Sequence, residues 1–101
     1  WTTSAADEAM GHSPVRSTNP YVRASARYNP TARRVSVHLH NYAINADGTP
    51  SPQTTTLLWN WGGAGAASVV RLGESAGAVD LSSGSAQIAL TEYAIVNFAV
   101  A

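Results

Sequence analysis

Alternation of apolar and polar residues is the strongest pattern in this chain, and it marks two neighbouring segments, residues 21–28 and 33–44. Every second position there holds a small or branched apolar residue, which is typical of a half-buried β-strand. The connecting residues 29–32 read Asn-Pro-Thr-Ala, and Asn-Pro is a strong turn signal. The pattern therefore predicts a β-hairpin with a four-residue loop.

The expected register of this hairpin follows from the loop. With Tyr28 opposite Arg33, the apolar residues pair along one face, namely Ala26 with Val35, Ala24 with Val37, and Val22 with Leu39. Arg23 then lies opposite His38 on the other face. A shift by one residue would bring apolar residues opposite polar ones, so the pattern specifies which face of each strand turns inward.

Further along the chain, short apolar segments alternate with loops that are rich in Gly, Pro, Ser and Asp. We expect strands at residues 54–61, 67–72, 86–90 and 94–101, a short strand within 79–81, and a turn at 62–66. The last of these strands is apolar on both faces, which is typical of a strand in the interior of a sheet.

These short strands, with turns about every 8 to 12 residues, predict an all-β fold: a single antiparallel β-sandwich or small barrel of about six or seven strands. Residues 1–20 show no period and are expected to form an extended N-terminal arm, while residues 21–101 form the sandwich. A chain of 101 residues corresponds to one domain. It starts without methionine, and we expect it to have been processed or cut from a larger protein.

Composition and charge limit the partners of such a domain. Six arginines balance six carboxylates, and 12% of residues are charged against 45% that are hydrophobic. The remaining surface of small polar residues suits an extracellular protein, or one that assembles with copies of itself or with a larger host, as in a virion. A neutral chain has no general attraction for nucleic acid or an anionic membrane. There is no cysteine for a disulfide or a thiolate metal site, and no motif implies a cofactor.

Residues 73–77 read Gly-Glu-Ser-Ala-Gly, which fits the Gly-x-Ser-x-Gly pattern and resembles the nucleophile segment of carboxylesterases. In that family a strand, a sharp turn and a helix present the serine. Here the residues after Ser75 are poor helix formers, and all three histidines precede Ser75, whereas the family places its histidine last. The six carboxylates also offer no pair that faces across a cleft. We therefore expect a loop at Ser75 and a non-catalytic chain.

One side of the predicted hairpin gathers five basic residues: Arg23, Arg27, Arg34, His38 and His40. Arg27 and Arg34 are expected to be cross-strand neighbours. Such a face suits an anion, an acidic glycan or an acidic partner surface; solvation, or pairing with the carboxylates of the other half of the chain, is the alternative. A metal site at His38 and His40 would need a third ligand, such as His12, beside the positive charge of Arg23. We expect none.

Trp59 and Trp61 share one face of the strand predicted at 54–61. Two indoles in this arrangement can form a flat platform on which sugar rings stack. Leu57 lies on the same face and favours core packing instead, and a protein interface is a third interpretation.

The stretches "NPYVRASARYNP", "RRVSVHLHNY" and "AQIALTEYAIVNFAVA" combine an entering strand, an alternating strand that ends in Asn-Tyr, and two closing strands joined at a tyrosine. In these features the chain resembles the C-terminal β-sandwich domains that follow the catalytic barrel of secreted glycoside hydrolases. The resemblance implies a non-catalytic module that stabilises a host enzyme domain or contacts polysaccharide. It identifies no functional residue.

Two other functions fit the sequence. Low charge, an extended arm and strands without lysine at their edges suit a self-assembling homo-oligomer, such as a capsid decoration, tail or pilus-like subunit. A small lectin that binds glycans by itself is the third possibility.

Overall fold

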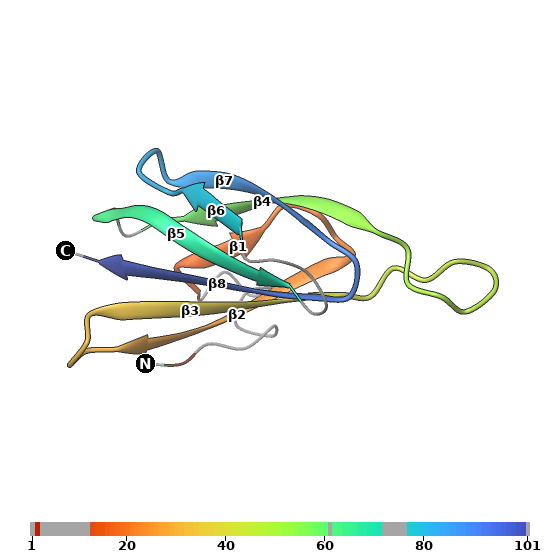
Figure 1. Ribbon diagram of the computed structural model, residues 1–101, viewed down its shortest axis with the longest axis horizontal. Helices are drawn as coiled ribbons and strands as arrows, with labels where there is room; N and C mark the ends of the chain where they lie inside the picture. Colours follow the sequence, from red (N-terminus) through yellow and green to blue (C-terminus); the bar gives the residue numbers. More distant parts are fainter. Residues whose placement is uncertain (1, 3–12, 61, 72–76, 101) are drawn as a thin grey trace.

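Two antiparallel β-sheets form the part of the chain that the computed structural model describes, which is residue 2 and residues 13–60, 62–71 and 77–100 (Figure 1). The strands are β1 (Val15–Ser17), β2 (Val22–Asn29), β3 (Arg34–Asn41), β4 (Gln53–Trp59), β5 (Ala64–Arg71), β6 (Gly77–Asp80), β7 (Ser85–Leu90) and β8 (Tyr93–Val100). One sheet has the order β1-β4-β7 and the other the order β2-β3-β8-β5-β6. The all-β sandwich class expected from the sequence is therefore confirmed. No helix that could cross a membrane occurs among these residues.

The expected hairpin is present as β2 and β3, but its register is shifted by two residues. Asn29 pairs with Arg34, so the four-residue loop is 30–33, and Arg23 lies opposite His40 instead of His38. The physical reason is the turn: the Asn29 carboxamide oxygen accepts hydrogen bonds from the backbone N–H groups of residues 31 and 32, at 3.1 and 3.2 Å. Because the shift is an even number of residues, each side chain stays on its expected face.

The Arg33 backbone completes this loop in the left-handed conformation, with φ of 52°. Its carbonyl accepts a hydrogen bond from the backbone N–H of Val100, at 2.9 Å. The loop is thereby tied to the end of β8, the neighbour of β3. This anchoring of the turn on the sheet stabilises the observed register, in which Tyr28 pairs with Val35 and not with Arg33 as expected.

β8 is the central strand of the five-stranded sheet, between β3 and β5. Its residues Ala94, Val96 and Phe98 are buried, while Ile95 on the opposite face is half-buried. The prediction of an interior strand is confirmed. β5 begins at Ala64, inside the stretch expected to form a turn, and a register irregularity between Ala64 and Ala67 accommodates these glycine-rich residues against β8.

The segment 13–20, which the sequence analysis assigns to the arm, packs into the domain. β1 pairs with β4, and Val15 is fully buried. The Ser17 and Thr55 hydroxyls are 2.5 Å apart, and the Asn19 carboxamide donates to the Gln53 carboxamide oxygen at 3.0 Å. A three-residue strand is too short to show an alternating pattern, so the sequence did not reveal it. The arm residues 3–12 lie outside the described part of the chain.

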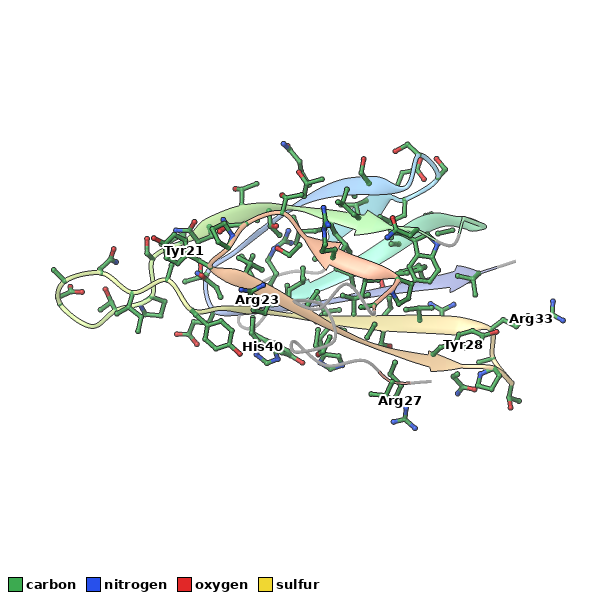
Figure 2. The ribbon with its side chains drawn as sticks, turned by 180° about the vertical axis from the view of Figure 1, so that it is seen from behind. Tyr21, Arg23, Arg27, Tyr28, Arg33 and His40 are labelled. Carbon is green, nitrogen blue, oxygen red and sulfur yellow. The ribbon has the colours of Figure 1, made fainter. Side chains whose placement is uncertain are left out.

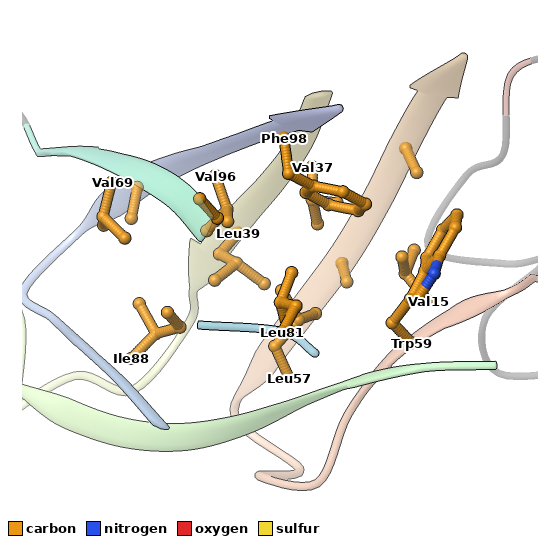
Figure 3. Packing of buried hydrophobic residues seen from close by; sticks show 14 of the residues in the cluster. Val15, Val37, Leu39, Leu57, Trp59, Val69, Leu81, Ile88, Val96 and Phe98 are labelled. Atoms are coloured by element: carbon orange, nitrogen blue, oxygen red, sulfur yellow. The ribbon is translucent and has the colours of Figure 1, made fainter. Parts of the chain in front are cut away.

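The core lies between the two sheets (Figure 3). Its largest side chains come from both layers: Leu39, Val69, Val96 and Phe98 from the five-stranded sheet, Val15, Leu57, Trp59 and Ile88 from the three-stranded sheet, and Leu81 from the loop after β6. The rings of Trp59 and Phe98 meet edge to face across the layers, with centroids 5.0 Å apart. Opposite the hairpin turn, the loop between β3 and β4 projects from one end of the sandwich (Figure 1).

Candidate functional site

The five basic residues singled out in the sequence do gather on one surface, the outer face of the five-stranded sheet. Arg23 and Arg27 occupy β2, and Arg34, His38 and His40 occupy β3, at the positions that alternate with the buried residues. Figure 2 labels Arg23, Arg27 and His40 among them. The expected pairing of Arg27 with Arg34 is wrong, because the register places Ser36 opposite Arg27 and Asn29 opposite Arg34. The two guanidinium groups are thus not forced into a like-charge cross-strand pair.

Four rings on this face form a continuous row, which we call the ring cluster: Tyr42, His40, Tyr93 and His38. The rings of His40 and Tyr42 are stacked with centroids 6.4 Å apart. The rings of His40 and Tyr93 are 4.8 Å apart and tilted by 60°. The Tyr93 hydroxyl forms a hydrogen bond with Nδ1 of His38. The cluster therefore crosses from β3 to β8 and extends to the residue that follows β3.

Strand pairing explains why these rings meet. The register places His40 beside Tyr93 and His38 beside Ile95, so the two histidines flank the first residues of β8. Tyr42 is held at the end of β3 by a backbone hydrogen bond from its N–H to the Tyr21 carbonyl oxygen, at 2.8 Å. The sequence analysis did not name either tyrosine as a site residue: it placed Tyr93 between the two closing strands and used Tyr42 only as the end of the alternating strand. The alternation in the segment 33–44 could have revealed Tyr42, because it places Tyr42 on the same face as His38 and His40.

The ring cluster is uncharged at its centre at neutral pH. Partial burial, and then the proximity of His38, lower the pKa of His40 from its ordinary value of 6.5. His40 is therefore the neutral imidazole at pH 7. Arg23, which pairs with His40 in the register, brings a positive charge to the border of the cluster.

Beyond the rings, the outer face continues as a mixed apolar and polar surface. Val70 pairs with Ile95, which pairs with His38, and the Val70 side chain is 45% exposed. In the adjacent row the Ser36 hydroxyl donates to the Asn97 carboxamide oxygen at 2.6 Å. The exposed outer positions of β3 and β8 hold no carboxylate. Together with the arginines of β2 and β3, the face thus combines aromatic rings, aliphatic groups and hydrogen-bonding groups.

Trp59, proposed as half of a sugar platform, belongs to the core. Its side chain is 3% exposed, and its indole N–H donates to the Gly62 carbonyl oxygen at 2.9 Å. An indole in this position presents no open ring face to a sugar, so Trp59 is removed from the platform, and the core-packing interpretation is correct for this residue. Its proposed companion, Trp61, lies outside the described residues.

No cluster of three potential metal ligands occurs within the described residues. His12, the third ligand considered in the sequence analysis, lies outside them, as does Ser75. Asp47, in the loop between β3 and β4, and Asp80, the last residue of β6, form local hydrogen bonds with Thr49 and Ser82. The Thr49 hydroxyl lowers the pKa of Asp47, and the Ser82 backbone N–H lowers the pKa of Asp80. Both carboxylates therefore stabilise turns.

The chain matches no family model, no curated protein and no solved structure. The argument for a function therefore starts from the geometry of the outer face and of the ring cluster.

Proposed function

We propose that this chain is a non-catalytic β-sandwich module of a secreted carbohydrate-active protein, and that it contacts polysaccharide through the ring cluster. The observation that supports this function is the row of stacked and tilted rings on the outer face of the five-stranded sheet. As a module it would hold a host enzyme domain near its substrate, without performing the reaction itself.

The chemistry of a sugar chain matches the chemistry of this face. A pyranose ring offers an apolar C–H face and a rim of hydroxyl groups, and a tyrosine or neutral histidine offers an apolar ring with a polar tip. Tyr42 is 61% exposed and gives such a ring direct access to a ligand. The Ser36 and Asn97 side chains lie further along β3 and β8, where they can bond to hydroxyl groups of the sugar. An open sheet face suits an extended polymer better than an enclosed small molecule.

Binding to a panel of polysaccharides tests this function. The intact chain should be retained in affinity electrophoresis by at least one polysaccharide, and Tyr42→Ala should weaken binding by about tenfold or more, because a stacking ring is lost. Tyr21→Ala is the matched control, since Tyr21 is 57% exposed and does not belong to the ring cluster. Its affinity should stay within about twofold of the unmodified chain. Equal losses in both variants, or no retention by any polysaccharide, would count against the proposal.

A self-assembling structural subunit is the second candidate, and one observation favours it. Thr2 forms an isolated antiparallel bridge with Arg27 on β2, the edge strand of the five-stranded sheet. This edge therefore accepts pairing from a segment outside the sheet, and in an assembly we expect such a segment to come from a neighbouring copy. Light scattering separates the two functions: large regular oligomers would support the subunit, and a monomer would support the module. A stand-alone lectin, the third possibility, would bind glycans without requiring any host domain.

A further inference from the structure

A pocket separate from the ring cluster lies at one end of the sandwich and is lined by residues of both sheets. It is an open pocket of about 480 Å³, lined by Pro52, Gln53, Thr54, Arg71, Ala89, Leu90 and Thr91. These residues belong to the start of β4, the end of β5 and the end of β7, which lie at the end from which the loop between β3 and β4 projects (Figure 1). We call it the Arg71 pocket.

Arg71 enters the pocket because of the alternation along β5. Ala67 and Val69 point into the core, and Arg71 continues the same face at the end of the strand, where the core ends. Its side chain is half-buried, and its Nε–H donates to the Ala89 carbonyl oxygen on β7, at 2.5 Å. This bond holds the guanidinium between the sheets while its two terminal amino groups remain for another acceptor.

Among the described residues, none that lines this pocket provides a counterion for Arg71. None of the lining residues is a carboxylate, and Arg71 forms no ion pair with the described residues. A half-buried guanidinium with a fixed orientation is suited to bidentate binding of a carboxylate. Nη1 lies 3.3 Å from the position that a Cβ of Gly77 would take, so the absence of a side chain at Gly77 leaves room for the guanidinium.

The other lining groups indicate a ligand larger than a simple anion. Thr54 and Thr91 are exposed and offer hydroxyl groups, while the exposed Pro52 and Ala89 offer apolar surface. Leu90 also lines the pocket, but its side chain is buried in the core. The Gln53 carboxamide is kept in place by its hydrogen bond with Asn19. The volume is within the range of small-molecule pockets and far exceeds what one inorganic anion fills. No aromatic ring lines the pocket for a nucleobase to stack on.

We propose that the Arg71 pocket binds a uronic acid unit, with the sugar carboxylate on the terminal amino groups of Arg71 and the sugar hydroxyls on Thr54 and Thr91. This inference rests on the proposed function and names the class of polysaccharide that the module prefers, an acidic one. The pocket and the ring cluster would then recognise two different features of the polymer: its charge and its ring faces.

Titration with monosaccharides tests the pocket separately from the ring cluster. Sodium glucuronate, added to the ¹⁵N-labelled chain, should shift the backbone amide signals of Ala89, Leu90 and Thr91. Glucose and sodium acetate should each bind at least about tenfold more weakly than glucuronate, since each provides only half of the recognition. Binding of acetate as tight as that of glucuronate would overturn the sugar assignment, and an absence of shifts with glucuronate would overturn the pocket.

Arg71→Gln should weaken glucuronate binding by at least about tenfold, because a charge-assisted bidentate contact is lost. Arg16→Gln is the control of equal charge change: Arg16 is exposed on β1, at the opposite edge of the three-stranded sheet from β7. It should leave the affinity within about twofold of the unmodified chain. Equal loss in the two variants would overturn the role of Arg71.

The two proposals fail in different ways. If Tyr42→Ala abolishes polysaccharide binding and glucuronate causes no shift, the proposed function stands and the pocket does not. If glucuronate binds through Arg71 and no polysaccharide is retained, the pocket is supported as a site, and the proposed function with its polymer is overturned.

Discussion

The two faces of the five-stranded sheet use the same strands for different purposes. Val37 and Val96 pair on the inner face, and both are fully buried. The neighbouring pair, His38 and Ile95, lies on the outer face, and both of its side chains are only half-buried. The inner face is covered by the three-stranded sheet, and the outer face carries the ring cluster. Folding free energy should therefore depend mainly on the inner face, which leaves the outer face free to serve contact with a ligand.

The largest expected difference between the faces concerns their hydrophobic residues. Phe98→Ala should lower the free energy of unfolding by about 3–5 kcal/mol, because it removes a buried ring that contacts Trp59 and leaves a cavity. Ile95→Ala, three positions earlier on the outer face, should cost about 1 kcal/mol. Urea denaturation followed by tryptophan fluorescence measures both values. Similar costs for the two variants would show that the outer face is as tightly packed as the core.

A smaller effect is expected from the polar row of the outer face. Asn97→Ala removes the acceptor of the Ser36 hydroxyl and should cost about 1 kcal/mol. A double-mutant cycle with Ser36→Ala isolates the contribution of the hydrogen bond, and a coupling energy of about 0.5 kcal/mol or more is expected. Additive costs would mean that water satisfies both groups equally well. In that case the hydrogen bond between the two side chains would contribute nothing to stability.

The smallest effect is a pH dependence that the ring cluster introduces. Folding lowers the pKa of His40, so the unfolded chain binds a proton more readily than the folded one. The stabilising contribution of neutral His40 is complete above the ordinary pKa of 6.5 and is lost as the pH falls through the lowered value. Stability curves should thus decline less below pH 6.5 for His40→Gln than for the unmodified chain. Parallel curves would show that His40 is solvated as freely as in the unfolded chain.

Alternation allowed much of the five-stranded sheet to be predicted. It correctly assigned the inner face of the β2–β3 hairpin and the interior position of β8, because a two-residue period needs only local sequence. The register was wrong by two residues, since the Asn29 side chain closes the turn later than the Asn-Pro signal suggested. β1 was missed because three residues do not establish a period.

The candidate site, too, could be predicted from the sequence only in part. The outer position of His38 and His40 follows from the alternation in β3, so this half of the ring cluster was visible in the sequence. Tyr93 is 53 positions from His40 in the chain, and only the pairing of β3 with β8 brings the two rings together. The interpretations of Trp59 could be separated only by the burial of its side chain, which packs against Phe98 of the other sheet.

The order of the amino acids by itself determined that this chain is built of strands, and which side of most strands is apolar, because side chains alternate from residue to residue. Only the tertiary structure decided the order of the strands, the register of the hairpin and the residues that meet across strands or sheets. Those contacts join residues that are tens of positions apart in the chain. Many different strand pairings would place the apolar residues on the inner face equally well, so the alternating pattern does not select among them. The ring cluster and the Arg71 pocket both depend on these contacts of the tertiary structure.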